Sequence, residues 1–374
     1  MKDTNRRTFL KHTATMAAVT PLAVHAAGGD MIRVGLIGCG GRGTGAAAQA
    51  LKADKNVKLT AMADAFADKI DRSFETLSKQ AEVKDKLDVP KERRFTGFDA
   101  YKQVTDNVDV VLLTTPPHFR PLHIEYAVEQ GKHIFAEKPV AVDSAGVRSV
   151  LAACEKAKTK KVSVVSGLCL RYYNCFEETM RKIHNGDIGD VVCLQANDYR
   201  GGAWDRTRAK LTETLGREPT EMEYQMRNWY HFTWASGDQI CEQHIHNLDV
   251  GNWVMQGYPI QANGMGGGEM RMGGDRTKSQ IFDHTFVEYT YANGHKMYSQ
   301  GRHLGGNATF GHVAEYAHGS KGVCKLAASI IPFDGNPIPI RGKGGGHQQE
   351  QTDLIEALGK GEIYNEGEYG AKAT

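Results

Sequence analysis

An acid, an imidazole and a second acid occur at helical spacing in the second half of the chain. Glu242, His246 and Asp249 fall at positions i, i+4 and i+7, which share one face of a helix. Histidine has the side-chain pKa nearest neutrality, and a neighbouring carboxylate can orient the ring and tune that pKa. We therefore predict that His246 and Asp249 act in proton transfer and that Glu242 and His246 face a substrate. The alternative is a histidine that only packs this helix onto a sheet.

A lysine at the end of a short apolar segment is the next candidate. Residues 133–136 are predicted to form a buried strand, and Glu137, Lys138 and Pro139 follow it directly. A flexible ammonium group at such a strand end can stabilise negative charge that develops on a substrate oxygen in a dry cleft. Lys138 is therefore predicted to be catalytic. The alternative is a surface lysine that pairs with Glu137.

No metal site is predicted. His244 and His246 form an H-x-H pair, but on a helix the two rings diverge by about 200°. The seven cysteines include no C-x-x-C pair and have no regular spacing. This pattern favours buried single thiols over a zinc site or a disulfide framework.

A glycine-rich turn near the start of the chain predicts a dinucleotide site. Gly38, Gly40 and Gly43 fit G-x-G-x-x-G between a predicted strand at 32–37 and an Ala-rich helix. The phosphates would lie at the helix N-terminus, where free N–H groups and the positive end of the helix dipole point at them. The same turn contains three more predicted nucleotide contacts, namely Cys39, Gly41 and Arg42.

Asp64 favours NAD over NADP as the nucleotide. It follows the apolar segment 57–63 and lies roughly 20 residues beyond Gly43. A carboxylate at that place accepts hydrogen bonds from the ribose hydroxyls of NAD and repels the additional phosphate of NADP. NAD is therefore the predicted cofactor, with NADP less favoured.

The elements around these residues predict a doubly wound parallel sheet over residues 31–166. Apolar segments at 108–113 and 162–166 join those above, and helical segments alternate with them. Ligands of such sheets bind outside the carboxyl ends of the strands, so residues at those ends should meet in one crevice. Besides the glycine turn and Asp64, the predicted nucleotide contacts at these ends are Thr115, Pro116, His118, Glu137 and Lys138.

Four motifs together resemble the Gfo/Idh/MocA oxidoreductase family, which includes glucose-fructose oxidoreductase and inositol dehydrogenases. They are the glycine turn at 38–43, Thr115-Pro116, Gly131-Lys132-His133 and Glu137-Lys138-Pro139. The resemblance implies an α/β protein with an N-terminal Rossmann domain and a C-terminal α+β domain at 167–374. That second domain would hold a large, open, mostly antiparallel sheet, which forms the substrate wall and often the oligomer interface. A homo-oligomer is therefore expected.

The resemblance also implies roles for single residues. It places Lys138 at the nicotinamide end of the cleft, in contact with the substrate hydroxyl, and the peptide before the proline is often strained or cis. The family pattern D-x-x-x-H-x-x-D makes His246 the general base, and Glu242 stands where its first aspartate would be, which leaves the role of Glu242 open. A looser match at 167–172 implies substrate contacts for Arg171 and Tyr172. An ion pair between domains is an equal alternative for Arg171.

Residues 200–237 do not resemble the family core. A polar, charged middle is flanked by aromatic residues, among them Trp234. An aromatic face can stack on the apolar face of a sugar ring, so Trp234 is predicted to bind substrate. The alternative, which we favour for any individual ring, is that these rings pack the segment onto the body of the protein.

The first 27 residues resemble a twin-arginine export signal. Arg6 and Arg7 precede a mildly apolar stretch, and small residues at Val24, Ala26 and Ala27 suit a signal peptidase. The resemblance implies that the twin-arginine machinery exports the folded protein to the periplasm. No other segment is long and apolar enough to span a bilayer, so no membrane attachment is expected after processing.

Composition gives no indication of a nucleic acid partner. The net charge is +2, and the segment before Gly28 contributes +3, which leaves the rest near −1. The 374 residues, 40% hydrophobic and 24% charged, are ordinary for a globular protein of about two domains.

These expectations converge on an exported NAD-dependent oxidoreductase that acts on a hydroxyl group of a sugar, glycoside or polyol. An alternative comes from exported NAD-dependent α-N-acetylgalactosaminidases, which this chain resembles in its signal and in a G-x-G-x-R-G-like turn that Arg42 fits. Those enzymes cleave glycosides by oxidation, elimination, hydration and reduction around a folded-in, tightly held cofactor. A third possibility is a non-catalytic sugar- or nucleotide-binding protein, against which Lys138 and His246 argue.

Overall fold

The computed structural model describes residues 31–275, 277–305 and 310–374 of the chain. The predicted export signal at residues 1–27 lies outside these ranges. Across the described ranges, no helix has the length and apolar character needed to cross a membrane.

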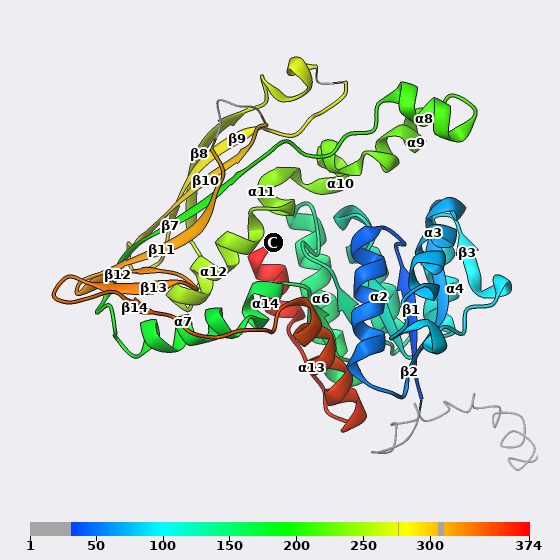
Figure 1. The fold of residues 1–374 in the computed structure, drawn as a ribbon, viewed down its shortest axis with the longest axis horizontal. Coiled ribbons are helices and arrows are strands. Elements are labelled where there is room, and N and C mark those ends of the chain that lie inside the picture. The colour runs from blue at the N-terminus through cyan, green and yellow to red at the C-terminus, as the bar shows by residue number, and fades with distance from the viewer. Residues whose placement is uncertain (1–30, 276, 306–309) are drawn as a thin grey trace, which may run out of the picture.

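Six parallel strands form the first sheet, in the order β3-β2-β1-β4-β5-β6 (Figure 1). The order changes direction between β1 and β4, and ligands of such sheets bind at this switch point. The strands are β1 Ile32–Ile37, β2 Val57–Asp64, β3 Arg94–Thr96, β4 Val110–Leu113, β5 His133–Ala136 and β6 Val164–Ser166.

Helices cover both faces of this sheet, which is why its central strands are apolar on both sides. One apolar cluster includes α2 and α3, and the other includes α4, α5 and α6. Their bounds are α2 Gly41–Ala53, α3 Ala67–Ser78, α4 Ala100–Asp106, α5 Arg120–Glu129 and α6 Ser144–Lys160. The predicted Rossmann domain is confirmed.

The end of the chain returns to the first domain. α13 (His347–Gly359) packs along α2, and its Leu354, Ile355 and Leu358 belong to the same apolar cluster. α14 (Gly367–Ala373) packs against α6 and β6. Sequence reasoning placed all residues after 166 in the second domain and did not anticipate this return.

Eight strands form the second sheet, in the order β14-β13-β12-β11-β7-β10-β9-β8. Its strand pairs are antiparallel except for β7 with β10, which confirms the predicted mostly antiparallel sheet. The strands are β7 Val191–Arg200, β8 Gln261–Gly267, β9 His284–Thr290, β10 Lys296–His303, β11 His312–Gly319, β12 Gly322–Lys325, β13 Ser329–Pro332 and β14 Ile338–Pro339.

One face of the second sheet carries helices and the other face is open (Figure 1). α7 (Asn174–His184) and α12 (Ile245–Met255) share an apolar cluster with β7, β10 and β11. Between β7 and α12 the chain forms four further helices: α8 Arg208–Leu215, α9 Glu221–Arg227, α10 Thr233–Ser236 and α11 Asp238–Glu242. α8 and α9 lie above α3 of the first domain (Figure 1).

The single helix predicted to carry Glu242, His246 and Asp249 is two helices. α11 ends at Glu242, and α12 begins at Ile245. Between them the N–H groups of Gln243 and His244 both donate to the carbonyl oxygen of Gln239, which interrupts the regular i to i−4 pattern. The i, i+4, i+7 argument therefore holds only from His246 onward.

Candidate active site

The glycine turn leaves the N-terminus of α2 open. α2 begins at Gly41, and Gly40 precedes it without a side-chain hydrogen bond to the first turn. A Cβ atom on Gly40 or Gly41 would meet no atom within 4 Å. Free N–H groups at this helix end therefore face open space, which is what binding of a dinucleotide phosphate requires.

Two other glycines let the backbone approach itself closely. Gly38 has a φ of +97°, and a Cβ atom there would lie 2.6 Å from the backbone nitrogen of Thr115. A Cβ atom on Gly43 would collide with the carbonyl oxygen of Gly38 and lie 2.5 Å from Thr114 Oγ1. Neither position accepts a side chain, so the turn is held tightly against the end of β4.

Asp64 lies beside this turn, at the end of β2. Its carboxylate accepts hydrogen bonds from the N–H groups of Cys39 at 2.7 Å and Phe66 at 3.0 Å. Burial raises the pKa of the Asp64 carboxyl group, and the two hydrogen bonds oppose that shift. The Cys39 thiol itself is buried, with Sγ 3.4 Å from the carbonyl oxygen of Ala63.

A cavity of about 420 Å³ joins these features. Its predicted nucleotide contacts are Gly38, Gly40, Gly41, Arg42, Gly43, Asp64, Thr115 and Pro116. The residues fit a dinucleotide, because an open helix N-terminus and a carboxylate at a neighbouring strand end share one cavity. Four other predicted contacts, Cys39, His118, Glu137 and Lys138, are not among the described residues that line it.

Lys138 connects the first domain to the second. It follows β5, and the Lys138–Pro139 peptide is cis. Its Nζ donates to the backbone carbonyl oxygen of Glu242 and lies 3.3 Å from Glu242 Oε1. Both side chains are only 12% exposed, so this ion pair is well shielded from water. The alternative partner considered for Lys138, Glu137, is paired elsewhere.

His246 lies in the first turn of α12, near Lys138. Its Nδ1 atom is buried and has no hydrogen-bond partner among the residues that the structure describes. Burial and the positive charge of Lys138 hold the pKa of His246 well below its usual range. The imidazole is therefore neutral at pH 7, the form that can accept a proton, and its buried Nδ1 is left free for a hydrogen bond.

Asp249 is engaged in a two-point ion pair rather than with His246. Arg171 donates from Nε to Asp249 Oδ2 and from Nη2 to Oδ1, both at 2.8 Å. The guanidinium also lies over the rings of Tyr369 and Trp253. Arg171 thus forms an ion pair within residues 167–374 rather than between domains. The pair gives Asp249 a positioning role on α12, so the predicted part of Asp249 in proton transfer gains no support.

Tyr172 lies in a different cluster from the one predicted. Its hydroxyl donates to the Glu366 carboxylate, and Tyr364 Oη is 3.3 Å away. These partners belong to the C-terminal segment that returns to the first domain, which sequence reasoning did not foresee. The hydroxyl is buried among them, so the predicted substrate contact needs correction.

Trp234 fixes two segments to each other. Its Nε1 donates to Gln225 Oε1 at 2.7 Å, and its ring packs edge-on against His118 and Phe119. This contact joins the 200–237 segment to the chain after β4. It involves His118, which was predicted to contact the nucleotide. The packing interpretation of Trp234 is favoured over sugar stacking.

Glu137 is buried and is paired with Arg42, with Nε 2.5 Å from Oε1. Atoms of Glu137, His347 and Glu350 that could bind a metal lie within 4.8 Å of one another. Arg42 already compensates the charge of Glu137, which disfavours a cation there. The absence of a metal site remains a prediction.

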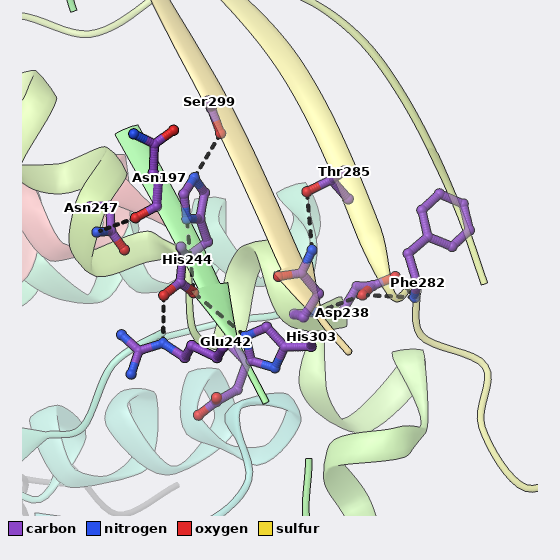
Figure 2. Close-up of polar contacts among 12 residues, drawn as sticks. Asn197, Asp238, Glu242, His244, Asn247, Phe282, Thr285, Ser299 and His303 are labelled. Carbon is purple, nitrogen blue, oxygen red and sulfur yellow. Dashed lines mark hydrogen bonds and ion pairs between the residues drawn. The ribbon is translucent and has the colours of Figure 1, made fainter. Parts of the chain in front are cut away.

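A buried polar network beside α12 was not predicted. The Asp198 carboxylate on β7 is paired with Arg200 and lies 3.5 Å from His303 Nε2 and 3.9 Å from His244 Nδ1. Figure 2 shows the hydrogen bond from the His244 ring to Ser299, at 2.7 Å, which joins the start of α12 to β10. Burial lowers the pKa of His244 to about 4. The H-x-H pair was its only sequence signal, because its partners come from distant strands.

Comparison with known proteins identifies the first domain. Residues 32–166 match the family model GFO_IDH_MocA, described as an oxidoreductase family with an NAD-binding Rossmann fold. An uncharacterized oxidoreductase of Streptococcus pneumoniae is 26% identical over 189 residues, 50% of this chain and 45% of that protein. A glycosyl hydrolase family 109 protein of Shewanella pealeana is 32% identical over 116 residues, 30% of this chain and 24% of that protein. These matches span less than half the length of the curated relatives.

Solved structures resemble the chain over nearly its whole described length. Aldose-aldose oxidoreductase from Caulobacter crescentus has a TM-score of 0.69 at 17% identity, covering 92% of this chain and 94% of that one. Scyllo-inositol dehydrogenase from Lactobacillus casei, solved with NAD(H) and scyllo-inositol, has a TM-score of 0.65 at 15% identity, covering 92% and 93%. At such identities the likeness shows a shared two-domain fold. The glycine turn and Asp64, which share the cavity, lie within residues 32–166, the part of the chain that matches the Gfo/Idh/MocA oxidoreductase family model with its NAD-binding Rossmann fold.

Proposed function

We propose that this protein is an NAD-dependent oxidoreductase that oxidises a hydroxyl group of a sugar, glycoside or polyol. The observation that carries the proposal is the meeting of Lys138, Glu242 and His246 beside the crevice at the carboxyl ends of the first sheet. These groups come from different domains, and the low pKa of His246 keeps its imidazole neutral, as a proton acceptor must be.

Each residue has one task in this scheme. NAD supplies the acceptor for the hydride that leaves the substrate carbon. His246, neutral at pH 7, accepts the proton of the hydroxyl group, and a carbonyl group forms. Lys138 stabilises the negative charge that develops on the substrate oxygen, and Glu242 holds the Lys138 ammonium in place through its carbonyl and carboxylate oxygens.

The carbohydrate class is supported by the relatives' own descriptions. A structural neighbour binds scyllo-inositol together with NAD(H), and another is an aldose-aldose oxidoreductase. To test the class, purified protein should be mixed with NAD and a panel of sugars, glycosides and polyols while NADH absorbance is followed. If no member of the panel yields NADH or a new product, the proposal fails.

A second candidate is a glycosidase that uses NAD without net turnover. The match to a glycosyl hydrolase family 109 protein, 32% identical over 116 residues, favours it. Such an enzyme releases free sugar from a glycoside and accumulates no NADH, so assaying both products in one reaction separates the two candidates.

We also propose that the protein is exported by the twin-arginine route and forms a homo-oligomer. Replacing Arg6 and Arg7 by Lys should leave the protein in the cytoplasm. Met265, Phe286 and Ile331 are exposed on β8, β9 and β13 of the second sheet, and an apolar surface of this kind suits a second copy. Light scattering on wild type and on Phe286→Asp tests this, since only the wild type should form the larger species.

A further inference from the structure

The second domain supplies one wall of the nucleotide cavity. After β7 the chain crosses to the first domain, and α8 and α9 lie above α3 (Figure 1). Five side chains of this segment line the cavity together with the glycine turn and Asp64: Trp204, Arg206, Met226, Arg227 and Trp229. The family match ends at residue 166, so it assigns no role to any of them.

An ion pair fastens this segment to the first domain. Arg227 donates from Nη2 to Asp68 Oδ1 at 2.8 Å and from Nη1 to Oδ2 at 3.1 Å. The guanidinium also lies 4.0 Å from the ring centre of Phe66. Asp68 and Phe66 follow Asp64 directly, at the predicted ribose end of the cavity, so the attachment point is beside the nucleotide site.

The two ends of the segment are held together as one unit. Asn228 Oδ1 accepts from the N–H group of Arg206 at 2.8 Å, and Asn228 Nδ2 donates to the Arg206 carbonyl oxygen at 2.9 Å. The Arg206 guanidinium donates to the Arg227 carbonyl oxygen at 2.8 Å and lies over the Trp204 ring. Movement of Arg227 would therefore carry Arg206 and Trp204 with it.

Two cations in this cavity have no carboxylate partner. Lys69 on α3 and Arg206 both line it, and neither forms an ion pair within the part of the chain that the structure describes. Burial and the charge of Arg206 lower the pKa of Lys69, and burial and the charges of Arg227 and Arg72 lower the pKa of Arg206. A partly buried pair of like charges is stabilised by an anion, and the phosphates of a dinucleotide are anions that this cavity is built to admit.

We propose that residues 203–229 form a nucleotide strap, in which Arg206 and Lys69 bind the anionic part of the dinucleotide and the Asp68–Arg227 ion pair holds the strap closed. Trp204 and Trp229 cover the nucleotide from the side of the second domain. Release of the nucleotide requires the ion pair to open, so exchange with free nucleotide is slow. The inference rests on the proposed function only in taking NAD as the ligand.

The test measures nucleotide release without any carbohydrate. Protein loaded with NADH is mixed in a stopped-flow instrument with excess NAD, and the loss of energy transfer from tryptophan to NADH gives the dissociation rate. Asp68→Asn should raise that rate about tenfold, because a two-point ion pair at the closed strap is lost. Arg206→Met should raise it by a similar factor and should reduce its dependence on salt. The exposed pair Arg208 and Glu221 lies in the same segment, so Arg208→Met is the matched control and should release NADH at the wild-type rate.

Asp68 is half exposed, so its replacement leaves the core intact. The charge-swapped double variant Asp68→Arg with Arg227→Asp should bring the rate back toward that of wild type. The strap is overturned if Asp68→Asn and Arg206→Met both release NADH within twofold of wild type. Because the assay needs no substrate, that result would leave the proposed reaction standing, and failure of the reaction would leave the release rates unchanged.

Discussion

The two walls of the cleft differ in the chemical groups that they present. At the glycine turn the first-domain wall is backbone: Gly40 and Gly41 at the start of α2 have open space beside them, and two further glycines have no room for a Cβ atom. The second domain contributes side chains: Arg206 and Arg227 line the nucleotide cavity, and Glu242 and His246 lie near Lys138 outside that lining. Changes of shape should therefore damage the first wall, and changes of charge the second.

The largest expected effect is on the second wall. His246→Asn keeps a polar group of similar size but removes the proton acceptor, so turnover should fall by about 10² to 10⁴. NAD affinity, measured by titration, should stay near that of wild type, because the side chain does not line the nucleotide cavity. His295→Asn, in the turn between β9 and β10, is the control. Near-normal turnover of the His246 variant on the true substrate would contradict its role.

Removal of the neighbouring charge should reduce the rate and move its pH dependence. Lys138→Met should lower turnover by about 10² to 10³, since it removes charge stabilisation at the substrate oxygen. Lys138 also holds the pKa of His246 down, so without it that pKa rises. Because His246 must be neutral to accept a proton, the variant then begins to lose turnover at a higher pH as the solution is acidified. The acid limb of the pH–rate profile of this variant should therefore shift to higher pH. An unchanged acid limb would show that Lys138 does not lower the pKa of His246.

The side chain of Asp64 on the first wall acts by charge rather than by shape. Asp64→Ala should weaken NAD binding by about 10- to 100-fold, the range for a lost hydrogen bond to a charged group. It should weaken NADP binding less, because it also removes repulsion of the extra phosphate. Asp99→Ala, at an exposed carboxylate of the same domain, serves as control. Equal effects on both nucleotides would show that Asp64 does not select between them.

Shape alone should matter at the glycines. Gly43→Ala places a methyl group against the Gly38 carbonyl oxygen, so it should lower the free energy of unfolding by about 1 to 3 kcal/mol. Gly41→Ala is the matched control, because it starts the same helix and meets open space. In the nucleotide-free protein, Gly41→Ala should leave the free energy of unfolding unchanged or raise it slightly. Denaturant unfolding of both variants measures the difference, and similar losses would contradict the steric explanation.

The smallest expected effect concerns the buried network at His244. Its pKa is about 4 in the folded protein and about 6.5 in the unfolded chain. Between these values the unfolded state binds one more proton, so the free energy of unfolding falls as the pH drops, by up to about 1.4 kcal/mol per pH unit. His244→Gln should remove the contribution of His244 to this dependence of the free energy of unfolding on pH. An unchanged slope would show that His244 binds protons equally in the folded and unfolded states.

Sequence reasoning succeeded where the signal is local. The glycine turn, Asp64 and Lys138 lie at the ends of short apolar strands, and the alternation of strands and helices predicts that they meet at one edge of a sheet. It was less successful in the second domain. His244, Asp198 and His303 lie on three elements far apart in the chain, and no spacing rule relates them.

Periodicity also misled where a helix is interrupted. Glu242 was placed on one face with His246, but the turn at 243–244 separates the two helices and lets Glu242 meet Lys138 instead. Arg171 and Tyr172 illustrate a related limit. Their partners Asp249 and Glu366 are 78 and 194 residues away, so only the folded chain could show that both are satisfied within the protein.

The sequence by itself determined the parallel sheet, the nucleotide turn and the identity of a lysine at a strand end. Each is signalled by a sequence pattern that fits within about 30 residues, where steric and hydrogen-bonding preferences act through neighbouring backbone. Only the tertiary structure decided which segment closes over the nucleotide. The strap is attached through Asp68 and Arg227, 159 residues apart, and such a pairing depends on the docking of two domains rather than on any local preference.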